Sequence, residues 1–338
     1  MIKFLSFLFL VLLENSFPIF SQKIIGNTTV TPRMRVIVDN DFSGDPDGLF
    51  QLAHLLLSPS VEIRGIIGSH LKVGDGFDRS KTQAQNAAKK AKELLKVMNL
   101  GIKIPVIAGS DTAIPNDSTP VKSEAVNFII KEALRTDTKQ PLYLRCGAGL
   151  TEIASALLSA PQIADKLTLV WIGGAEYSEL AYPPPNYSNL EYNLNIDIPA
   201  ARVVFNQSSI HIWQVPRNTY RQAILPYSQL LLNIKPKGKT GNYLSEILEN
   251  LMKRISKFLN IGETYLLGDS PLVLLTALQS SFEADPSSST YALKMAPKIN
   301  PQGAYEFNPK GRNIRVYTQL DINLMFNVFF AKLELFNK

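Results

Sequence analysis

Apolar positions along the chain follow two alternating periods. Short runs of β-branched and other apolar residues are typical of buried strands, and longer segments with apolar residues at helical spacing are typical of helices. The two kinds of segment alternate for most of the length, which predicts βαβ units and therefore an α/β fold with a mostly parallel central sheet flanked by helices. The predicted strands are 35–39, 61–68, 104–108, 141–145, 168–172 and 210–215, and the predicted helices are 47–57, 80–98, 122–134, 149–158 and 198–205.

The second half of the chain contains a long predicted loop and a long helical region. Residues 177–190 are rich in Tyr, Pro, Asn and Ser, and ordered loops of this length often form lids or binding loops. Residues 225–266 are predicted to be helical, with a turn at Pro236-Lys237-Gly238-Lys239. A last strand is expected at 312–320, followed by a helix from Asn323.

The N-terminal residues have the pattern of a signal peptide. Lys3 precedes the apolar residues 4–13, and Ser21 is a small residue suited to the cleavage site. The apolar run is too short to span a bilayer, which takes ~20 residues. We therefore expect residues 1–21 to be a signal peptide and 22–338 a single domain, with no stable membrane insertion. Such a protein would be exported, either periplasmic or secreted from a bacterium.

The net charge and the cysteine content limit the possible partners. The formal net charge is +6, but the basic residues are scattered along the sequence. The densest group lies on a predicted helix and is typical of a solvated face rather than a nucleic-acid site. It consists of Lys89, Lys90, Lys92 and Lys96. We therefore expect no nucleic-acid partner, and the only cysteine, Cys146, predicts no disulfide within the chain.

An acidic turn follows the first predicted strand. Four carboxylates lie within nine residues, mixed with Gly and Pro: Asp39, Asp41, Asp45 and Asp47. Ligands of open α/β sheets bind outside the carboxyl ends of the strands. Crowded carboxylates repel one another unless a cation or a raised pKa relieves them, and oxygen ligands suit Ca²⁺ or Mg²⁺. The alternative is a solvated turn, which Asp, Gly and Pro also form.

Six short motifs occur in a fixed order along residues 33–335. The acidic turn 39–47 comes first, followed by segments 104–111 (IPVIAGSD), 147–154 (GAGLTEIA), 171–175 (WIGGA), 191–193 (EYN) and 269–272 (DSPL). Together they resemble motifs of the inosine–uridine-preferring nucleoside hydrolases. That family begins with Asp-x-Asp-x-Gly-x-Asp-Asp or with a longer form that contains Gly-Asp-Pro-Asp-Asp. Each motif alone is weak, but their order makes the resemblance specific.

The resemblance implies a function and a set of catalytic and metal-binding residues. The enzyme would hydrolyse the N-glycosidic bond of a ribonucleoside or a related N-riboside to free base and ribose, using a Ca²⁺-bound water. Asp41 would bind the metal and act as the general base. Thr151, through its carbonyl, and Asp269 would complete the metal site. Asp45 or Asp47 would supply further oxygens.

The same resemblance implies substrate contacts and partners. Asp39, Glu191 and Asn193 would contact the ribose, and His70 is a further candidate because it follows the second strand. The implied partner is a small-molecule nucleoside, and the chain would form a homodimer or homotetramer.

Two positions depart from the family pattern. Gly48 stands where the family has its second consecutive aspartate, a metal ligand, so Asp45 or Asp47 must supply the missing oxygens. Gly268 stands where some members have a histidine that protonates the leaving purine. The motifs therefore predict the fold more firmly than the activity, and they leave open the acid that assists the leaving base.

Two alternative functions are compatible with the sequence. A nucleoside- or sugar-binding protein without turnover would share the fold, and Gly48 favours that possibility. Haloacid dehalogenase-like phosphatases also place Asp-x-Asp after a first strand, and Gly268-Asp269-Ser270 imitates one of their later motifs. Their further aspartate is missing, however, because position 273 is Val. The phosphatase alternative is therefore weaker than the hydrolase.

Overall fold

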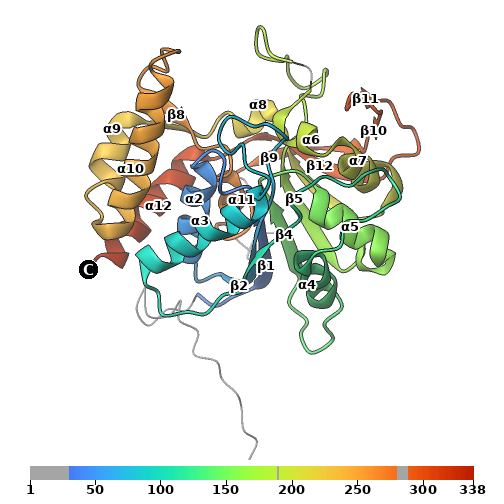
Figure 1. Ribbon diagram of the computed structural model, residues 1–338, viewed down its shortest axis with the longest axis horizontal. Coiled ribbons are helices and arrows are strands. Elements are labelled where there is room, and N and C mark those ends of the chain that lie inside the picture. The colour runs from blue at the N-terminus through green and yellow to red at the C-terminus, as the bar shows by residue number, and fades with distance from the viewer. Residues whose placement is uncertain (1–29, 189, 280–287) are drawn as a thin grey trace, which may run out of the picture.

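A mixed eight-stranded sheet forms the centre of the protein (Figure 1). The computed structural model describes residues 30–188, 190–279 and 288–338. All neighbouring strands of this sheet are parallel except for the last pair, β12 and β9. The strands, in their order across the sheet, are β3 (Val106–Ala108), β2 (Val61–Gly68), β1 (Met34–Asn40), β4 (Leu142–Cys146), β5 (Leu167–Ile172), β6 (His211–Val215), β12 (Asn313–Gln319) and β9 (Thr290–Met295).

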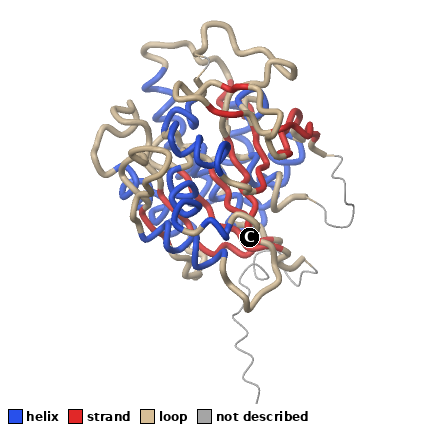
Figure 2. The backbone as a smooth tube through the Cα atoms, turned by 90° about the vertical axis from the view of Figure 1, so that its right-hand side faces the viewer, coloured by secondary structure: helices blue, strands red, loops and turns tan. Residues whose placement is uncertain are grey.

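Helices cover both faces of the sheet, as Figures 1 and 2 show. One layer contains α2 (Asp47–Leu56), α3 (Gln83–Met98), α10 (Gly238–Ile255) and α12 (Ile322–Phe336). The other layer contains α4 (Glu124–Ala133), α5 (Thr151–Ser159) and α7 (Ile198–Arg202). In β1, Val36 and Val38 belong to the first core and Ile37 to the second. This alternation explains why the strand reads as a continuous apolar run.

The carboxyl end of β1 lies where the strand order reverses direction. From β1 the chain proceeds outward to β2 and β3, and then returns to pair β4 with the other side of β1. In open α/β sheets this arrangement leaves a crevice between the two diverging connections. The acidic turn begins at this crevice.

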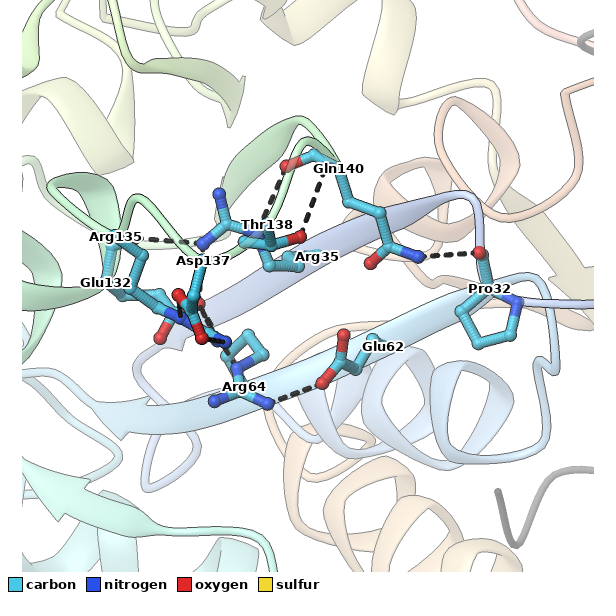
Figure 3. A network of polar contacts seen from close by, with 9 residues as sticks. All are labelled: Pro32, Arg35, Glu62, Arg64, Glu132, Arg135, Asp137, Thr138 and Gln140. Carbon is cyan, nitrogen blue, oxygen red and sulfur yellow. Dashed lines mark hydrogen bonds and ion pairs between the residues drawn. The ribbon is translucent and has the colours of Figure 1, made fainter. Parts of the chain in front are cut away.

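The opposite end of β1 is held by a network of ion pairs, shown in Figure 3. Glu132, near the end of α4, is buried and accepts from three arginines. Arg35 Nη1 lies 2.7 Å from Glu132 Oε1, Arg135 Nη1 lies 3.0 Å from it, and Arg64 Nε lies 3.2 Å from it. The network joins α4 to β1 and β2 at the edge of the sheet that faces away from the crevice.

The remaining elements are short. They are η1 (Pro161–Ile163), α6 (Tyr192–Ile196), η2 (Val203–Gln207), α8 (Arg217–Tyr220), β7 (Ile224–Pro226), α9 (Tyr227–Gln229), η3 (Leu230–Ile234), β8 (Thr264–Leu266), α11 (Pro271–Leu274), β10 (Lys298–Ile299) and β11 (Tyr305–Glu306). The predicted α/β fold with a mostly parallel sheet is confirmed. The predicted loop 177–190 contains no helix or strand among its described residues and rises at the top of Figure 1.

The structure differs from the sequence prediction in two regions. The ends of segment 225–266 are not helical, because β7 and β8 pair as antiparallel strands and bury Leu225. Strand β9 was not predicted, because an exposed edge strand lacks the continuous apolar run of the central strands, and its Leu293 is 66 % exposed.

The predicted signal peptide lies outside the described residues. Among residues 30–188, 190–279 and 288–338, no helix is both long and apolar enough to cross a membrane.

Candidate active site

The acidic turn leads from β1 into α2. The Gly44 N–H donates to the carbonyl of Asp41 across 2.7 Å and closes a tight turn. Pro46 then occupies the N-cap of α2, and Asp47 is the first residue of the helix. A carboxylate at this position interacts favourably with the positive end of the helix dipole. The local sequence therefore fixes Asp41 and Asp47 at the crevice beside β1.

A cavity of about 500 Å³ opens over this turn. Its polar lining consists of acidic and amide side chains that are mostly buried, together with Arg221 and Thr264: the former are Asp41, Asp45, Asp47, Glu191, Asn193 and Asp269. Its aromatic lining consists of Phe77, Tyr187, Tyr192, Tyr220 and Tyr265. Of the aromatic residues, Phe77, Tyr187 and Tyr192 are exposed. The cavity therefore has a buried acidic part and an exposed aromatic part.

Asp269 comes from the far end of the chain and meets the acidic turn. Its backbone N–H donates to Asp47 Oδ2 at 3.2 Å, and its own Oδ2 accepts from Asn40 Nδ2 at 2.9 Å. The Asp45 carboxylate accepts from the Tyr265 hydroxyl at 2.6 Å and from the Asp47 N–H at 3.2 Å. The structure thus brings Asp41, Asp45, Asp47 and Asp269 together at one cavity.

Burial and mutual repulsion make these carboxylates reluctant to ionise. Burial, followed by the charge of Asp269, raises the pKa of Asp41 well above its usual range, and the pKa of Asp47 rises for the same reasons. Burial also raises the pKa of Asp45 to about 6 and that of Asp269 to about 7. A bound cation would reverse this effect by favouring the charged forms.

The donor set around the cavity suits a hard cation but forms an incomplete metal site. None of the four aspartates forms a direct ion pair with a basic side chain of the described residues, although the buried Arg145 acts on Asp269 electrostatically and Arg221 lies in the same lining. Among the residues that the structure describes, no three His, Cys, Asp or Glu side chains are grouped closely enough to hold a metal ion. Both oxygens of Asp45 and both of Asp47 already accept hydrogen bonds. Asp269 uses only its Oδ2 in a hydrogen bond, with Asn40, so Asp41 and Asp269 are the carboxylates best placed to hold one.

Glu191 and Asn193 line the cavity and also fix the helix α6. Glu191 is the N-cap of α6, and its Oε2 accepts from the N–H groups of Leu194 at 3.0 Å and Gly174 at 2.7 Å. Its Oε1 accepts from the Tyr220 hydroxyl at 2.9 Å. Asn193 Nδ2 donates to the carbonyl of Ile172 at 2.7 Å. Both side chains are therefore held rigidly at the cavity.

Asp39, His70 and Thr151 lie outside the lining of this cavity. Asp39 is buried and hydrogen-bonded to Ser69, and burial raises its pKa to about 7. His70 Nε2 and the Thr151 hydroxyl lie 2.9 Å apart, and the same hydroxyl donates to Asp197 at 2.7 Å. His70, Thr151 and Asp197 thus form one buried polar network, and Asp39 forms a separate buried contact with Ser69. The role of the Thr151 carbonyl as a metal ligand stays a prediction.

Several lining residues were missed by the sequence analysis. Tyr220 and Tyr265 have no local signal, because each becomes part of the site only through a contact with a distant carboxylate. Arg221 is a further lining residue and lies over the ring of Tyr187 at 4.8 Å from its centroid, whereas Arg254, outside the lining, lies over the Phe77 ring at 5.5 Å. Asn40 is not part of the lining but contacts Asp269, and its place between Asp39 and Asp41 in the motif was a sequence signal for it.

Comparison with known proteins identifies the family. The family model for inosine-uridine preferring nucleoside hydrolases matches residues 36–327, which is most of the chain. The chain belongs to this family. None of the curated proteins matches the sequence.

Solved nucleoside hydrolases share the fold. A plant nucleoside hydrolase superposes with a TM-score of 0.70 at 19% identity, covering 90% of this chain and 99% of the other. The purine-preferring ribonucleoside hydrolase from Gardnerella vaginalis gives 0.68 at 20% identity, with coverages of 90% and 99%. The inosine-uridine preferring nucleoside hydrolase from Bacillus anthracis gives 0.61 at 16% identity, with coverages of 89% and 99%.

These findings confirm the predicted family, the fold and the class of enzyme. Membership of the nucleoside hydrolase family supports an N-glycosyl hydrolase that acts on small-molecule nucleosides. It also removes the reason for considering a haloacid dehalogenase-like phosphatase.

Proposed function

We propose that this protein hydrolyses the N-glycosidic bond of ribonucleosides, or of related N-ribosides, to free base and ribose with the help of Ca²⁺. The observation that supports this most directly is the division of the cavity into an acidic part and an aromatic part. Ribose hydroxyls are hydrogen-bond donors that carboxylates can accept, and nucleobases stack on aromatic rings. A volume of about 500 Å³ is within the usual range for small-molecule sites.

The residues of the acidic part would bind the sugar. Asn193 uses its Nδ2 to bind the backbone carbonyl of Ile172, so its Oδ1 can accept from a ribose hydroxyl. Glu191 Oε1 accepts from Tyr220 and retains a further lone pair for a second hydroxyl. Asp47, at the start of α2, would accept from a third with a lone pair that its two backbone hydrogen bonds leave free. These groups orient the ribose with little loss of side-chain entropy, because the fold already fixes them.

Asp41 would act as the general base toward the attacking water. A base must be ionised, whereas burial and the charge of Asp269 raise the pKa of Asp41. Asp41 and Asp269 would hold the Ca²⁺, which when bound lowers the pKa of both carboxylates, orients the water and binds sugar hydroxyls. The cleavage develops positive charge on the ribose, and the carboxylates of the cavity stabilise it.

The departing base would be bound at the aromatic part of the cavity. No histidine is among the described lining residues, so protonation by an imidazole is not proposed. Phe77 and Tyr187 are exposed rings at the mouth and can stack on the base. The Tyr192 hydroxyl, which donates to Asp75 at 2.7 Å, is a polar group of the same lining.

We also propose that the chain is exported and that it assembles as a homodimer or homotetramer. The first proposal is supported by the charged and apolar pattern of residues 1–21, and the second by the resemblance to the family.

The test uses the purified protein with inosine, uridine and p-nitrophenyl riboside, with Ca²⁺ or with a chelator. Release of ribose that increases with Ca²⁺ is the expected result. Binding of nucleosides without any release of ribose would instead identify a nucleoside-binding protein that retains the fold. Equal release in Ca²⁺ and in chelator would contradict the role of the cation.

A further inference from the structure

Asn40 lies at the junction of the acidic turn, β4 and Asp269. It is the last residue of β1 and is completely buried. Its Nδ2 donates to Asp269 Oδ2 at 2.9 Å, across 229 positions of the chain. Its Oδ1 is buried and has no hydrogen-bond partner among the described residues. A buried amide with one side used and the other free is unusual, because unsatisfied polar atoms destabilise the fold.

Two glycines make room for this amide. A Cβ atom at Gly48 would lie 3.0 Å from Asn40 Nδ2 and 3.1 Å from its Oδ1. A Cβ atom at Gly147 would lie 2.6 Å from Asn40 Nδ2 and 2.7 Å from Asp269 Oδ1. Neither glycine has a positive φ, so the backbone itself does not require glycine there. The space that a side chain at position 48 would enter is therefore filled by the Asn40 amide.

We propose that Asn40 replaces, in this chain, the carboxylate that the family motif places at position 48. Asn40 is a positioning residue. Its neutral amide donates to Asp269 and fixes that carboxylate, whereas the motif would place a further negatively charged carboxylate at position 48. This inference rests on the proposed function for the identity of the site. Its consequence is that Ca²⁺ binds with one carboxylate fewer, and therefore more weakly than a site with the complete motif would bind it.

The charge of the site explains why an amide is suited to this position. Asp269 already lies in one cavity lining with Asp41, Asp45 and Asp47, and its N–H donates to Asp47 Oδ2. Another carboxylate beside Asp269 would add repulsion in the absence of a cation. The Asn40 N–H group instead stabilises the charged form of Asp269. The acidic site can thus assemble before any cation binds.

A double-mutant cycle tests the replacement directly. Gly48→Asp alone is expected to lower Tm, because its Cβ meets the Asn40 side chain. Asn40→Ala alone is expected to weaken Ca²⁺ binding by about tenfold, the usual effect of losing a group that orients a metal ligand. The double variant Asn40→Ala/Gly48→Asp restores the carboxylate and vacates its space. We expect it to bind Ca²⁺ at least about tenfold more tightly than the wild type.

The readouts are the Kd for Ca²⁺ from calorimetry and the Tm in chelator and in Ca²⁺. Tighter binding by the double variant than by the wild type and by either single variant supports the proposal. Two results overturn the proposal. In the first, the double variant binds Ca²⁺ no more tightly than the wild type. In the second, its change in binding free energy equals the sum of the changes in the two single variants. These measurements need no turnover, so a wild type that hydrolyses no nucleoside refutes the proposed function without affecting this result.

A second variant avoids the risk that the double variant does not fold. Asn40→Asp keeps the shape of the side chain and places a carboxylate beside Asp269. Its Tm in chelator is expected to fall by about 4 °C, and Ca²⁺ should raise its Tm more than that of the wild type. The matched control is Asn206→Asp, which changes a hydrogen-bonded asparagine on η2 away from the cavity. An equal response to Ca²⁺ in both variants overturns the proposal.

Discussion

The Tyr265 hydroxyl donates a hydrogen bond to Asp45 Oδ2 across 2.6 Å and so connects β8 to the acidic turn. The two residues are 220 positions apart, yet this contact and that of Asn40 with Asp269 connect residues 265–269 to β1 and the turn that follows it. Asp45 has one other donor, the Asp47 N–H. The geometry of the turn therefore depends on a residue from the opposite wall of the cavity.

Tyr265→Phe should destabilise the protein by about 2 kcal/mol, because it leaves the partly buried Asp45 carboxylate with the Asp47 N–H as its one remaining donor. We also expect a higher KM for nucleosides, since Asp45 and Asp47 would be held less firmly. Urea unfolding and steady-state kinetics measure the two effects. The matched control is Tyr227→Phe, which removes a hydrogen bond to the partly exposed Glu249. A loss of stability as large in the control would contradict the role of Tyr265.

The stability of the protein in chelator should decrease as the pH rises from 5 to 8. Burial raises the pKa of Asp45 to about 6 and the pKa values of Asp39 and Asp269 to about 7, above the usual 3.8. The folded state therefore binds more protons than the unfolded state in this window. The protonated carboxyl groups of Asp39, Asp45 and Asp269 contribute fully to stability below about pH 4, and this contribution is lost as the pH rises through 6 and 7.

The Tm measured from pH 5 to pH 8 checks this dependence. Added Ca²⁺ should reduce the difference, because a bound cation takes over the role of the protons. Asp269→Asn should also reduce it, since the amide does not titrate. A Tm that rises from pH 5 to pH 8 in chelator would show that other groups dominate.

Asp41→Asn should lower kcat by about 100-fold or more, the usual contribution of a general base. It should also abolish the stabilisation by Ca²⁺. In chelator, however, its Tm should equal or exceed that of the wild type, because a neutral amide replaces a carboxyl group whose charged form is costly at this buried position. The comparison of kcat with Tm in both buffers separates loss of chemistry from loss of fold. Retained activity in this variant would show that the base is another residue.

Arg217→Met should destabilise the protein by about 3 kcal/mol, because it leaves the Glu176 charge buried and unpaired. The two side chains form a buried double contact, with Arg217 Nε 2.7 Å from Glu176 Oε1. Arg217 Nη1 also donates to the carbonyl of Ser188 at 2.7 Å, which anchors the loop 177–190. We therefore expect KM to rise as well, since Tyr187 of that loop lines the cavity.

Unfolding by urea and nucleoside kinetics measure these effects. The double variant Glu176→Gln/Arg217→Met should recover part of the stability, because no charge remains unpaired. Lys90→Met, which breaks an exposed ion pair with Glu93, should change stability by less than about 1 kcal/mol. Equal losses from the exposed and buried pairs would contradict the argument.

Sequence periodicity predicted the central sheet well, because its inner strands are buried on both faces. Val36, Ile37 and Val38 point alternately into the two cores, so an apolar run was the correct signal. The same signal fails at β9, where one side of the strand has no neighbour and Leu293 is exposed. It also fails at β7 and β8, whose pairing joins residues about 40 positions apart.

The candidate site was predictable where it depends on local sequence. Asp41, Asp45 and Asp47 are brought together by one turn, and the motif order added Asp269, Glu191 and Asn193. Tyr220 and Tyr265 were not predictable, because their roles arise from contacts across the cavity. Thr151, by contrast, was predicted as a metal ligand but does not line the cavity. Its hydroxyl donates to Asp197, so only its carbonyl is left for the predicted binding of the metal.

Strand β12 lies between β6 and β9, although it is the last strand along the chain. While the chain is synthesised, the edge of β6 therefore stays unpaired until almost all residues have appeared. An open edge next to apolar strands is a site at which chains pair with one another and aggregate. Fragments that end before residue 313 would keep this edge permanently, so soluble expression should require the C-terminal strand even though it contributes no residue to the cavity lining.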